Sequence, residues 1–90
     1  MNFEWDPQKA ASNLRKHGVS FHEAATVLDD PLAITYPDPD HSESERRQVM
    51  FGESTEGRLL VVSLIERSGS IRIISARRAM RKERQIYEEG

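Results

Sequence analysis

The 90-residue sequence contains no cysteine, which excludes a disulfide framework and any metal site built from thiolates. It has no apolar run long enough to cross a membrane, and its first residues lack the basic start and apolar stretch of a secretory signal. We therefore expect a cytoplasmic protein without a membrane partner. This length suits one small domain with a single core, so we expect residues 1–90 to form one domain.

The sequence also lacks a glycine-rich phosphate loop and any cluster of metal ligands. Its three histidines have no partner at ligand spacing. The acids of Asp38, Asp40 and Glu43 resemble a calcium loop only weakly, because the stretch has no glycine to turn the loop. We therefore expect neither a metal nor another cofactor.

The charges that are present are unevenly distributed. The chain has 13 Lys and Arg against 15 Asp and Glu, and this slight acidity argues weakly against nucleic-acid binding. The distribution argues the other way, since residues 23–45 hold seven acids and no Lys or Arg, whereas residues 71–84 hold six bases and one acid. Such segregation indicates a basic surface in the C-terminal third that attracts acidic partners.

Two consecutive helices are predicted near the N-terminus. The Asp-Pro pair at residues 6–7 is typical of a helix start, and Gly18 is typical of the left-handed residue that follows a helix. Ser20 and Glu23 form a capping box that begins a second helix, and residues 29–31, Asp-Asp-Pro, end it. Both helices have apolar residues at helical spacing, so we expect them to cover a sheet.

Five stretches have the apolar pattern of strands: residues 2–5, 32–36, 46–51, 58–65 and 71–75. We expect the first to be an edge strand. The last four follow one another with a hairpin turn at residues 67–70, so they predict an antiparallel meander. From Ala76 onward the chain is rich in helix formers and predicts a C-terminal helix. The expected class is α+β, an antiparallel sheet packed with an N-terminal helix pair and a C-terminal helix.

A basic corner is predicted where the last strand meets the last helix. Arg72 stands among isoleucines, and Arg77, Arg81 and Arg84 would form one stripe of the helix. Arginine suits phosphate because its planar guanidinium donates two parallel hydrogen bonds. Glu83 falls within the predicted apolar stripe of the helix, so its carboxylate needs a partner, and one of these arginines is the obvious choice.

Several short motifs recur together in one known family, and their order and spacing carry the resemblance. They are Phe3-Glu4-Trp5-Asp6, Lys9, Asn13, Lys16-His17-Gly18-Val19-Ser20-Phe21, Glu23-Ala24, Asp30-Pro31, Gly57-Arg58, Ile71-Arg72-Ile73-Ile74-Ser75-Ala76-Arg77, Glu83-Arg84 and Tyr87. Across nearly its whole length the chain resembles the BrnT family, ribonuclease toxins of bacterial type II toxin–antitoxin systems.

This resemblance implies a RelE-like fold and metal-independent cleavage of RNA, which inhibits translation and growth. It also implies a cognate BrnA-like antitoxin of the ribbon-helix-helix class. The complex would repress its own operon, so contact with operator DNA would be indirect, through the antitoxin.

Metal-independent cleavage uses the ribose 2′-hydroxyl as nucleophile, and it needs a base, an acid and cations around the phosphate. The catalytic candidates are Arg58, Arg72, Arg77, His17, His41 and Glu83. The candidates for RNA binding are Arg46, Arg47, Lys16, Arg81 and Arg84. Several assignments have a structural alternative: the arginines of the C-terminal helix and Lys16 as solvated helix faces, His17 as a helix-end cap, His41 as a solvated loop residue, and Glu83 as a support for the arginines.

Two other functions compete with the ribonuclease. The same basic surface could serve a non-catalytic module that binds nucleic acid or a partner protein. A purely structural interaction domain would account for the charge segregation but not for Arg72 within an apolar strand.

Overall fold

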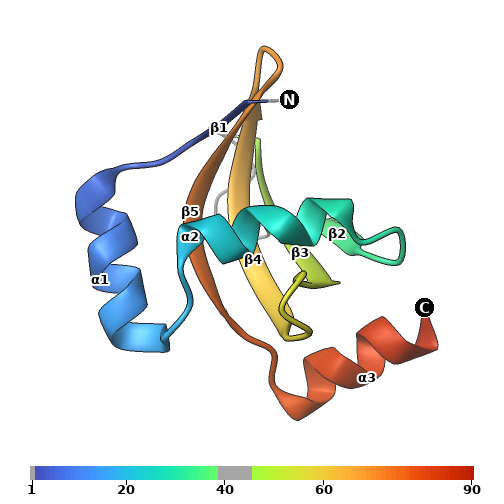
Figure 1. The fold of residues 1–90 in the computed structure, drawn as a ribbon. Coiled ribbons are helices and arrows are strands. Elements are labelled where there is room, and N and C mark those ends of the chain that lie inside the picture. Colours follow the sequence, from blue (N-terminus) through green and yellow to red (C-terminus); the bar gives the residue numbers. More distant parts are fainter. Residues whose placement is uncertain (1, 39–45) are drawn as a thin grey trace.

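A five-stranded sheet forms the centre of the molecule, and the computed structural model describes residues 2–38 and 46–90. The elements along the chain are β1 (Asn2–Glu4), α1 (Pro7–His17), α2 (Phe21–Ala25), the short 3-10 helix η1 (Thr26–Asp29), β2 (Ile34–Pro37), β3 (Arg47–Glu53), β4 (Leu59–Arg67), β5 (Ser70–Arg78) and α3 (Arg81–Glu89). Figure 1 shows α2 and η1 crossing one face of the sheet, with α1 beside β5. The α+β prediction is therefore confirmed.

The strand order is β1-β5-β4-β3-β2. Strands β2 to β5 form the expected antiparallel meander, since each pairs with the next along the chain. The first strand lies at the edge, as expected, and pairs with β5 in parallel through the register Asn2 with Ser70 to Glu4 with Arg72. The first two strands of the chain therefore lie at opposite edges of the sheet, and α1, α2 and η1 connect them.

The core lies between the sheet and the layer formed by α2 and η1. Leu60, Val62 and Leu64 alternate along β4 toward this layer, where Phe21 and Val27 are buried. Gly52 permits the close approach of β3 and η1, because a Cβ at this position would lie 2.6 Å from Val27 Cγ1. The other face of β4 is also buried at Leu59, Val61 and Ile65, which agrees with the uniformly apolar sequence of this strand.

The predicted C-terminal helix is present, but its predicted start at Ala76 was wrong. Strand β5 continues to Arg78, and α3 begins at Arg81 after the N-cap residue Met80. The reason is tertiary, since Ala76 is fully buried opposite Val62 and its pairing outweighs the helix propensity of the local sequence. Arg77 consequently lies on a strand and does not share a helical stripe with the arginines of α3.

The expected apolar stripe on the C-terminal helix is also largely absent. None of the nine residues of α3 is buried, and the side chains of Met80 and Ile86 are exposed. Tyr87 attaches the helix instead, because its hydroxyl donates a 2.6 Å hydrogen bond to Asp30 Oδ2. The helix is therefore held mainly by polar contacts.

Asn13 joins α1 to the edge of β5. Its side-chain nitrogen donates to the backbone oxygens of Val19 and Ala76, and its side-chain oxygen accepts from the Ala76 N–H at 3.1 Å. One side chain thus makes both of the hydrogen bonds that a neighbouring strand residue would make with Ala76. Because Asn13 is buried, α1 is fixed against β5 by this contact.

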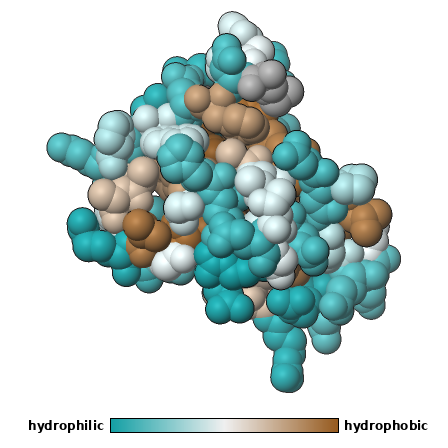
Figure 2. All heavy atoms as spheres, viewed as in Figure 1, coloured by the Kyte–Doolittle hydropathy of each residue, from teal (hydrophilic) through white to brown (hydrophobic). Residues whose placement is uncertain are grey.

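The surface seen in Figure 2 is mostly hydrophilic, with apolar residues in separate patches. Leu14 and Leu32 are among the exposed apolar side chains. Within residues 2–38 and 46–90, no helix has the length and apolar content needed to cross a membrane.

Candidate functional site

Arg72 and Arg77 lie on the same face of the sheet, opposite the face that α2 covers. Arg72 pairs with Ile65 and Arg77 pairs with Val61, and these partners lie four residues apart on a regular stretch of β4. Five residues separate the two arginines, an odd spacing that would put them on opposite faces of a regular strand. A β-bulge at Ile74 changes this, because β5 has one more residue than β4 between the pairs Ser63–Ser75 and Leu64–Ile73.

Arg77 binds Glu83 at the start of α3. Its Nη1 donates to Glu83 Oε1 at 2.8 Å and its Nη2 donates to Glu83 Oε2 at 2.7 Å. The expected arginine partner of Glu83 is therefore confirmed. The Arg77 hydrogen bond lowers the pKa of the Glu83 carboxyl more than partial burial raises it, so both groups are charged at neutral pH.

Arg72 is held more loosely. Its Nη1 lies 3.8 Å from Glu4 Oε2 on the adjacent β1, and the two side chains are 36% and 49% exposed. A pair this exposed adds little to stability, because water screens both charges. Arg72 is therefore accessible to an incoming anion.

A cavity of about 190 Å³ lies between α1 and the bulge in β5. Its lining residues are Lys9, Ser12, Asn13, Lys16, His17, Ile74 and Ser75. Ser75 pairs with Ser63, between the rows of Arg72 and Arg77 on the same face. The cavity thus brings two predicted site residues, Lys16 and His17, to the edge of the face that carries the two arginines.

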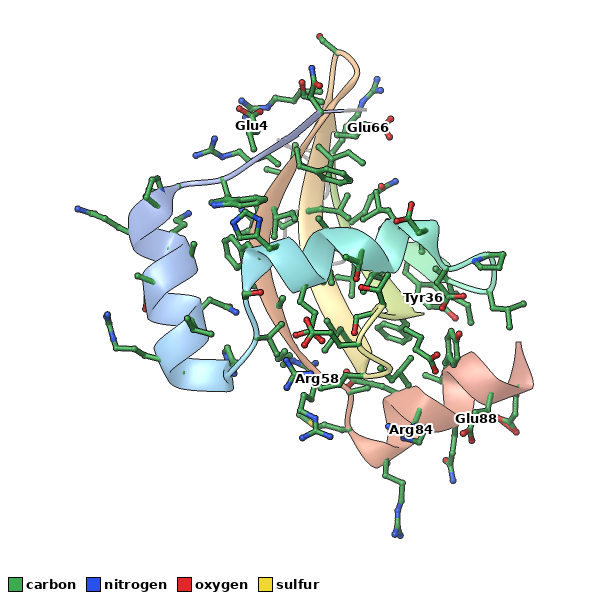
Figure 3. All side chains as sticks on the ribbon, viewed as in Figure 1. Glu4, Tyr36, Arg58, Glu66, Arg84 and Glu88 are labelled. Atoms are coloured by element: carbon green, nitrogen blue, oxygen red, sulfur yellow. The ribbon has the colours of Figure 1, made fainter. Side chains whose placement is uncertain are left out.

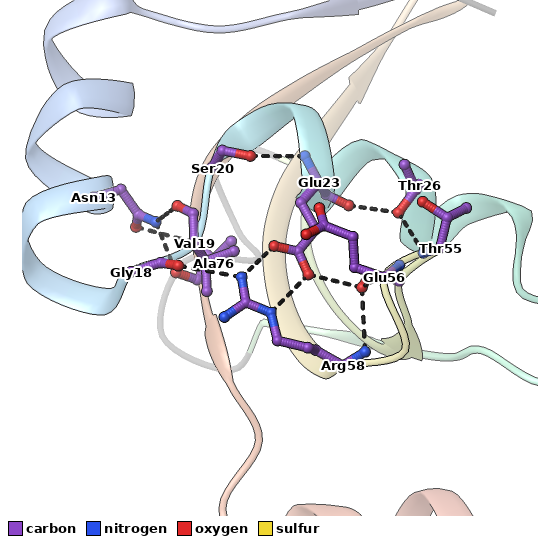
Figure 4. Close-up of polar contacts among 11 residues, drawn as sticks. Asn13, Gly18, Val19, Ser20, Glu23, Thr26, Thr55, Glu56, Arg58 and Ala76 are labelled. Carbon is purple, nitrogen blue, oxygen red and sulfur yellow. Dashed lines mark hydrogen bonds and ion pairs between the residues drawn. The ribbon is translucent and has the colours of Figure 1, made fainter.

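Arg58 lies on the other face of the sheet, beneath α2 (Figure 3). Its Nε donates to Glu23 Oε2 at 2.9 Å, its Nη2 donates to the second oxygen of that carboxylate, and Ser54 Oγ donates to Oε2 at 2.7 Å (Figure 4). The Arg58 hydrogen bond lowers the pKa of the buried Glu23 carboxyl more than desolvation raises it. Arg58 therefore joins α2 to the β3–β4 turn and is not grouped with Arg72 and Arg77.

Sequence reasoning did not find this role of Glu23. Its capping-box position predicts a side chain at a helix start, and Ser20 Oγ does accept from the Glu23 N–H at 3.0 Å. The Glu23 side chain, however, turns into the protein and is only 2% exposed. Thirty-five residues separate it from Arg58, so no local pattern indicates the pair.

The remaining candidates are spread over the molecule. Arg47 is half-buried on β3 opposite Ile65, on the face of Arg72 and Arg77. Arg46 is exposed just before β3, and Arg81 and Arg84 are exposed on α3. His41 lies outside the described residues. No group of three or more His, Cys, Asp or Glu side chains that could hold a metal occurs in the described part of the chain.

A family model described as "Ribonuclease toxin, BrnT, of type II toxin-antitoxin system" matches residues 5–83. The chain belongs to the BrnT family. As a member it is a ribonuclease toxin of a type II toxin–antitoxin system, and such a system includes a cognate antitoxin.

The fold agrees with this assignment. The crystal structure of the ribonuclease toxin BrnT from Brucella abortus is similar to this chain, with a TM-score of 0.71 and 24% identity over 90% of this chain and 99% of that one. No curated protein matches the sequence.

Proposed function

We propose that this BrnT-family protein cleaves RNA without a metal, on the face of the sheet that carries Arg72 and Arg77. The observation that carries the proposal is the bulge at Ile74, which places both guanidiniums on one face beside the cavity of Lys16 and His17. Cleavage by the 2′-hydroxyl requires cations around the phosphate and a group that exchanges a proton, and this face offers both.

Arg77 is arranged to bind a phosphate while it keeps its glutamate. A guanidinium has five N–H donors, and among the described residues three bonds from Arg77 reach Glu83 and the Arg78 carbonyl. Since Nη1 makes two of these bonds and Nη2 makes one, the Nε–H and one Nη2–H remain as a parallel pair. This pair fits two phosphoryl oxygens. Glu83 fixes the guanidinium and so reduces the entropy lost when phosphate binds.

His17 is the proposed proton-exchanging group. It lies at the end of α1, lines the cavity with Ser75 and is exposed to solvent. An imidazole can take the proton from the 2′-hydroxyl or give one to the leaving 5′-oxygen. Arg72 and Arg77 would then stabilise the charge that develops on the phosphoryl oxygens. Arg58 has a structural role in this proposal, because the sheet separates it from this face.

The test is cleavage of purified RNA in the presence of excess EDTA. Metal-independent attack by the 2′-hydroxyl leaves a 2′,3′-cyclic phosphate on one fragment and a 5′-hydroxyl on the other. We expect these ends and a rate that EDTA does not change. Cleavage that stops with EDTA and returns with Mg²⁺ would contradict the mechanism.

In the cell the proposed result is inhibition of translation and growth in the cytoplasm. The proposed antitoxin is a BrnA-like ribbon-helix-helix protein that covers Arg72 and Arg77 with acidic side chains or a helix, and that connects the toxin to operator DNA. An adjacent gene for such a protein, and restored growth on its co-expression, would support this. A stable complex that leaves both arginines open to guanidinium-specific reagents would count against it.

A further inference from the structure

We propose that the cavity between α1 and β5, the α1–β5 cavity, binds a backbone phosphate of a single-stranded RNA next to the scissile one. The inference rests on the proposed function and deepens it. The RNA would then contact the cavity as well as Arg72 and Arg77, and the cavity would hold the substrate on one side of the reaction centre.

The lining of the cavity carries the argument. Lys9 and Lys16 supply positively charged ammonium groups, and Ser12 and Ser75 supply hydroxyl donors. None of the seven residues that line the cavity is acidic. This composition matches a phosphate ester, which offers several strong acceptor oxygens and a negative charge.

The cavity adjoins the face of the sheet that carries Arg72 and Arg77. Ser75 belongs to both, because it lines the cavity and pairs with Ser63 between the rows of Arg72 and Arg77. Two residues along a strand span about 7 Å, so Ser75 lies near Arg77. A strand of RNA whose scissile phosphate meets Arg77 can therefore place a neighbouring phosphate over Ser75 and the lysines.

The helix that carries the lysines is held in place. Lys9 and Lys16 lie two turns apart on α1, about 10 Å along its axis, and Ser12 and Asn13 lie between them. Asn13 bonds both backbone groups of Ala76, so this side of α1 keeps its distance from β5. A fixed helix keeps the stems of both lysines beside the cavity.

An ordinary solvated face is the competing explanation, since exposed lysines on a helix are common. Arg15 provides the comparison within the same helix. It is an exposed cation in the same last turn but does not line the cavity. If only general positive charge mattered, Arg15 and Lys16 would contribute equally to RNA binding.

The experiment measures binding of a short, fluorescein-labelled single-stranded RNA with 2′-O-methyl riboses, which the protein cannot cleave. Fluorescence anisotropy gives the dissociation constant over a range of salt concentrations. Each phosphate contact with a single strand contributes about 0.7 to the slope of log K against log salt. We expect Lys9→Ala with Lys16→Ala to reduce the slope by at least about 0.7. Lys16→Ala alone should also reduce it, whereas Arg15→Ala, which removes one charge from the same turn, leaves it unchanged.

Two further variants test the site rather than its charge alone. Lys9→Arg with Lys16→Arg should restore the parental slope, since both cations return. Ser12→Asp should weaken RNA binding by placing a carboxylate in the cavity, whereas Gln8→Asp, on the same helix but outside the cavity, should weaken it less. Circular dichroism of each variant shows whether α1 is retained.

The possible outcomes separate the subsite from the proposed function. If the parent binds and cleaves RNA but the double alanine variant keeps the parental slope, the subsite is wrong and the proposed function stands. If the parent neither binds nor cleaves RNA, the proposed function itself fails. An equal loss with Arg15→Ala, or a loss of antitoxin affinity without a loss of RNA affinity, would also overturn the subsite.

Discussion

The protein contains two bidentate arginine–glutamate pairs in different surroundings, one through Nε and Nη2 of Arg58 and one through Nη1 and Nη2 of Arg77. In each, two guanidinium nitrogens donate to the two oxygens of one carboxylate. In the Arg58–Glu23 pair the glutamate side chain is 2% exposed and joins segments 35 residues apart. In the Arg77–Glu83 pair it is 19% exposed and joins neighbouring segments.

The difference shows that the surroundings of a bidentate arginine–glutamate pair, and not its hydrogen bonds alone, determine its role. Glu23 is buried and accepts from Ser54 as well, so the fold depends on keeping its charge satisfied. Arg77 lies on the face opposite α2 with its side chain 34% exposed, and among the described residues two of its N–H donors make no bond, so it can serve a ligand without losing its partner. We therefore expect the first pair to govern stability and the second to govern activity.

The largest expected effect is on cleavage. Arg77→Ala should lower the rate of RNA cleavage by about a hundredfold or more, because one charge-assisted contact with the transition state is lost. The free energy of unfolding should fall by only about 1 kcal/mol or less, since the pair is partly exposed. Rate measurements and urea denaturation of the same preparation separate the two effects.

Two variants serve as references for Arg77→Ala. Arg77→Lys should recover only part of the rate, because lysine cannot form the bidentate contact. Arg78→Ala, one residue on and paired with Leu60 on the helix-covered face, should cleave at the parental rate. A folded Arg77→Ala protein that cleaves as fast as the parent would remove Arg77 from the mechanism.

The next effect concerns the buried pair. Glu23→Gln keeps the size of the side chain but removes its charge, so the bonds from Arg58 and Ser54 become weaker. We expect the free energy of unfolding to fall by about 1.5–3 kcal/mol, the typical value of a hydrogen bond to a charged group. Urea denaturation measures the loss, and the cleavage rate per folded molecule should stay at the parental value. An unchanged unfolding midpoint would show that the pair is not needed for stability.

The Arg58–Glu23 pair should also make the free energy of unfolding depend on pH in the acid range. The Arg58 hydrogen bond lowers the pKa of Glu23 below its ordinary value of 4.5, so the unfolded state binds a proton more readily than the folded state. The stability from this group is thus complete above about pH 4.5 and is lost as pH falls through the lower folded-state pKa. Urea midpoints measured from neutral to acid pH should fall less steeply for Glu23→Gln than for the parent. Parallel curves would contradict the prediction.

The smallest effect is expected at the contact that attaches α3. Tyr87→Phe removes the hydrogen bond to Asp30 and should cost about 0.5–1.5 kcal/mol, less than a buried bond to a charged group because solvent reaches both side chains. Faster hydrogen exchange should be confined to α3. The hydrogen bond to Asp30 raises the pKa of Tyr87 to about 12 from 10.0, so its contribution is complete below pH 10 and is lost toward pH 12. Hydrogen exchange that is equal in parent and variant would show that other contacts hold the helix.

The sequence indicates those parts of the fold that local chemistry determines. The left-handed residue Gly18 and the caps at Asp6 and Ser20 are found where the sequence predicts them, because capping depends on a few adjacent residues. The strands of the meander are likewise evident from their apolar pattern. The position where β5 ends cannot be predicted from the local sequence, because the pairing of β5 with β4 and its contact with Asn13 involve distant residues.

The candidate site depends on such distant contacts to a greater degree. Arginine content indicates a basic surface, but only the register of β4 and β5 shows that Arg72 and Arg77 share a face. The bonds of Arg58 to Glu23 on α2 show that it does not belong to that face. The extra residue at Ile74 has no sequence signal of its own, since isoleucine suits a regular strand as well as a bulge. The sequence predicts that Glu83 binds an arginine but does not single out Arg77, which lies six residues away.

The contact of Asn13 with Ala76 also affects how the protein can associate with other chains. An uncovered strand edge is a template for pairing with another molecule, and β1 covers β5 only from Ser70 to Arg72. Asn13 occupies the backbone groups of Ala76 beyond that point, so an extended peptide cannot add along this part of β5. A protein that extends the sheet by strand addition must therefore pair with another edge, such as that of β2. Pro37, the last residue of β2, has no N–H and so cannot donate a hydrogen bond to an added strand.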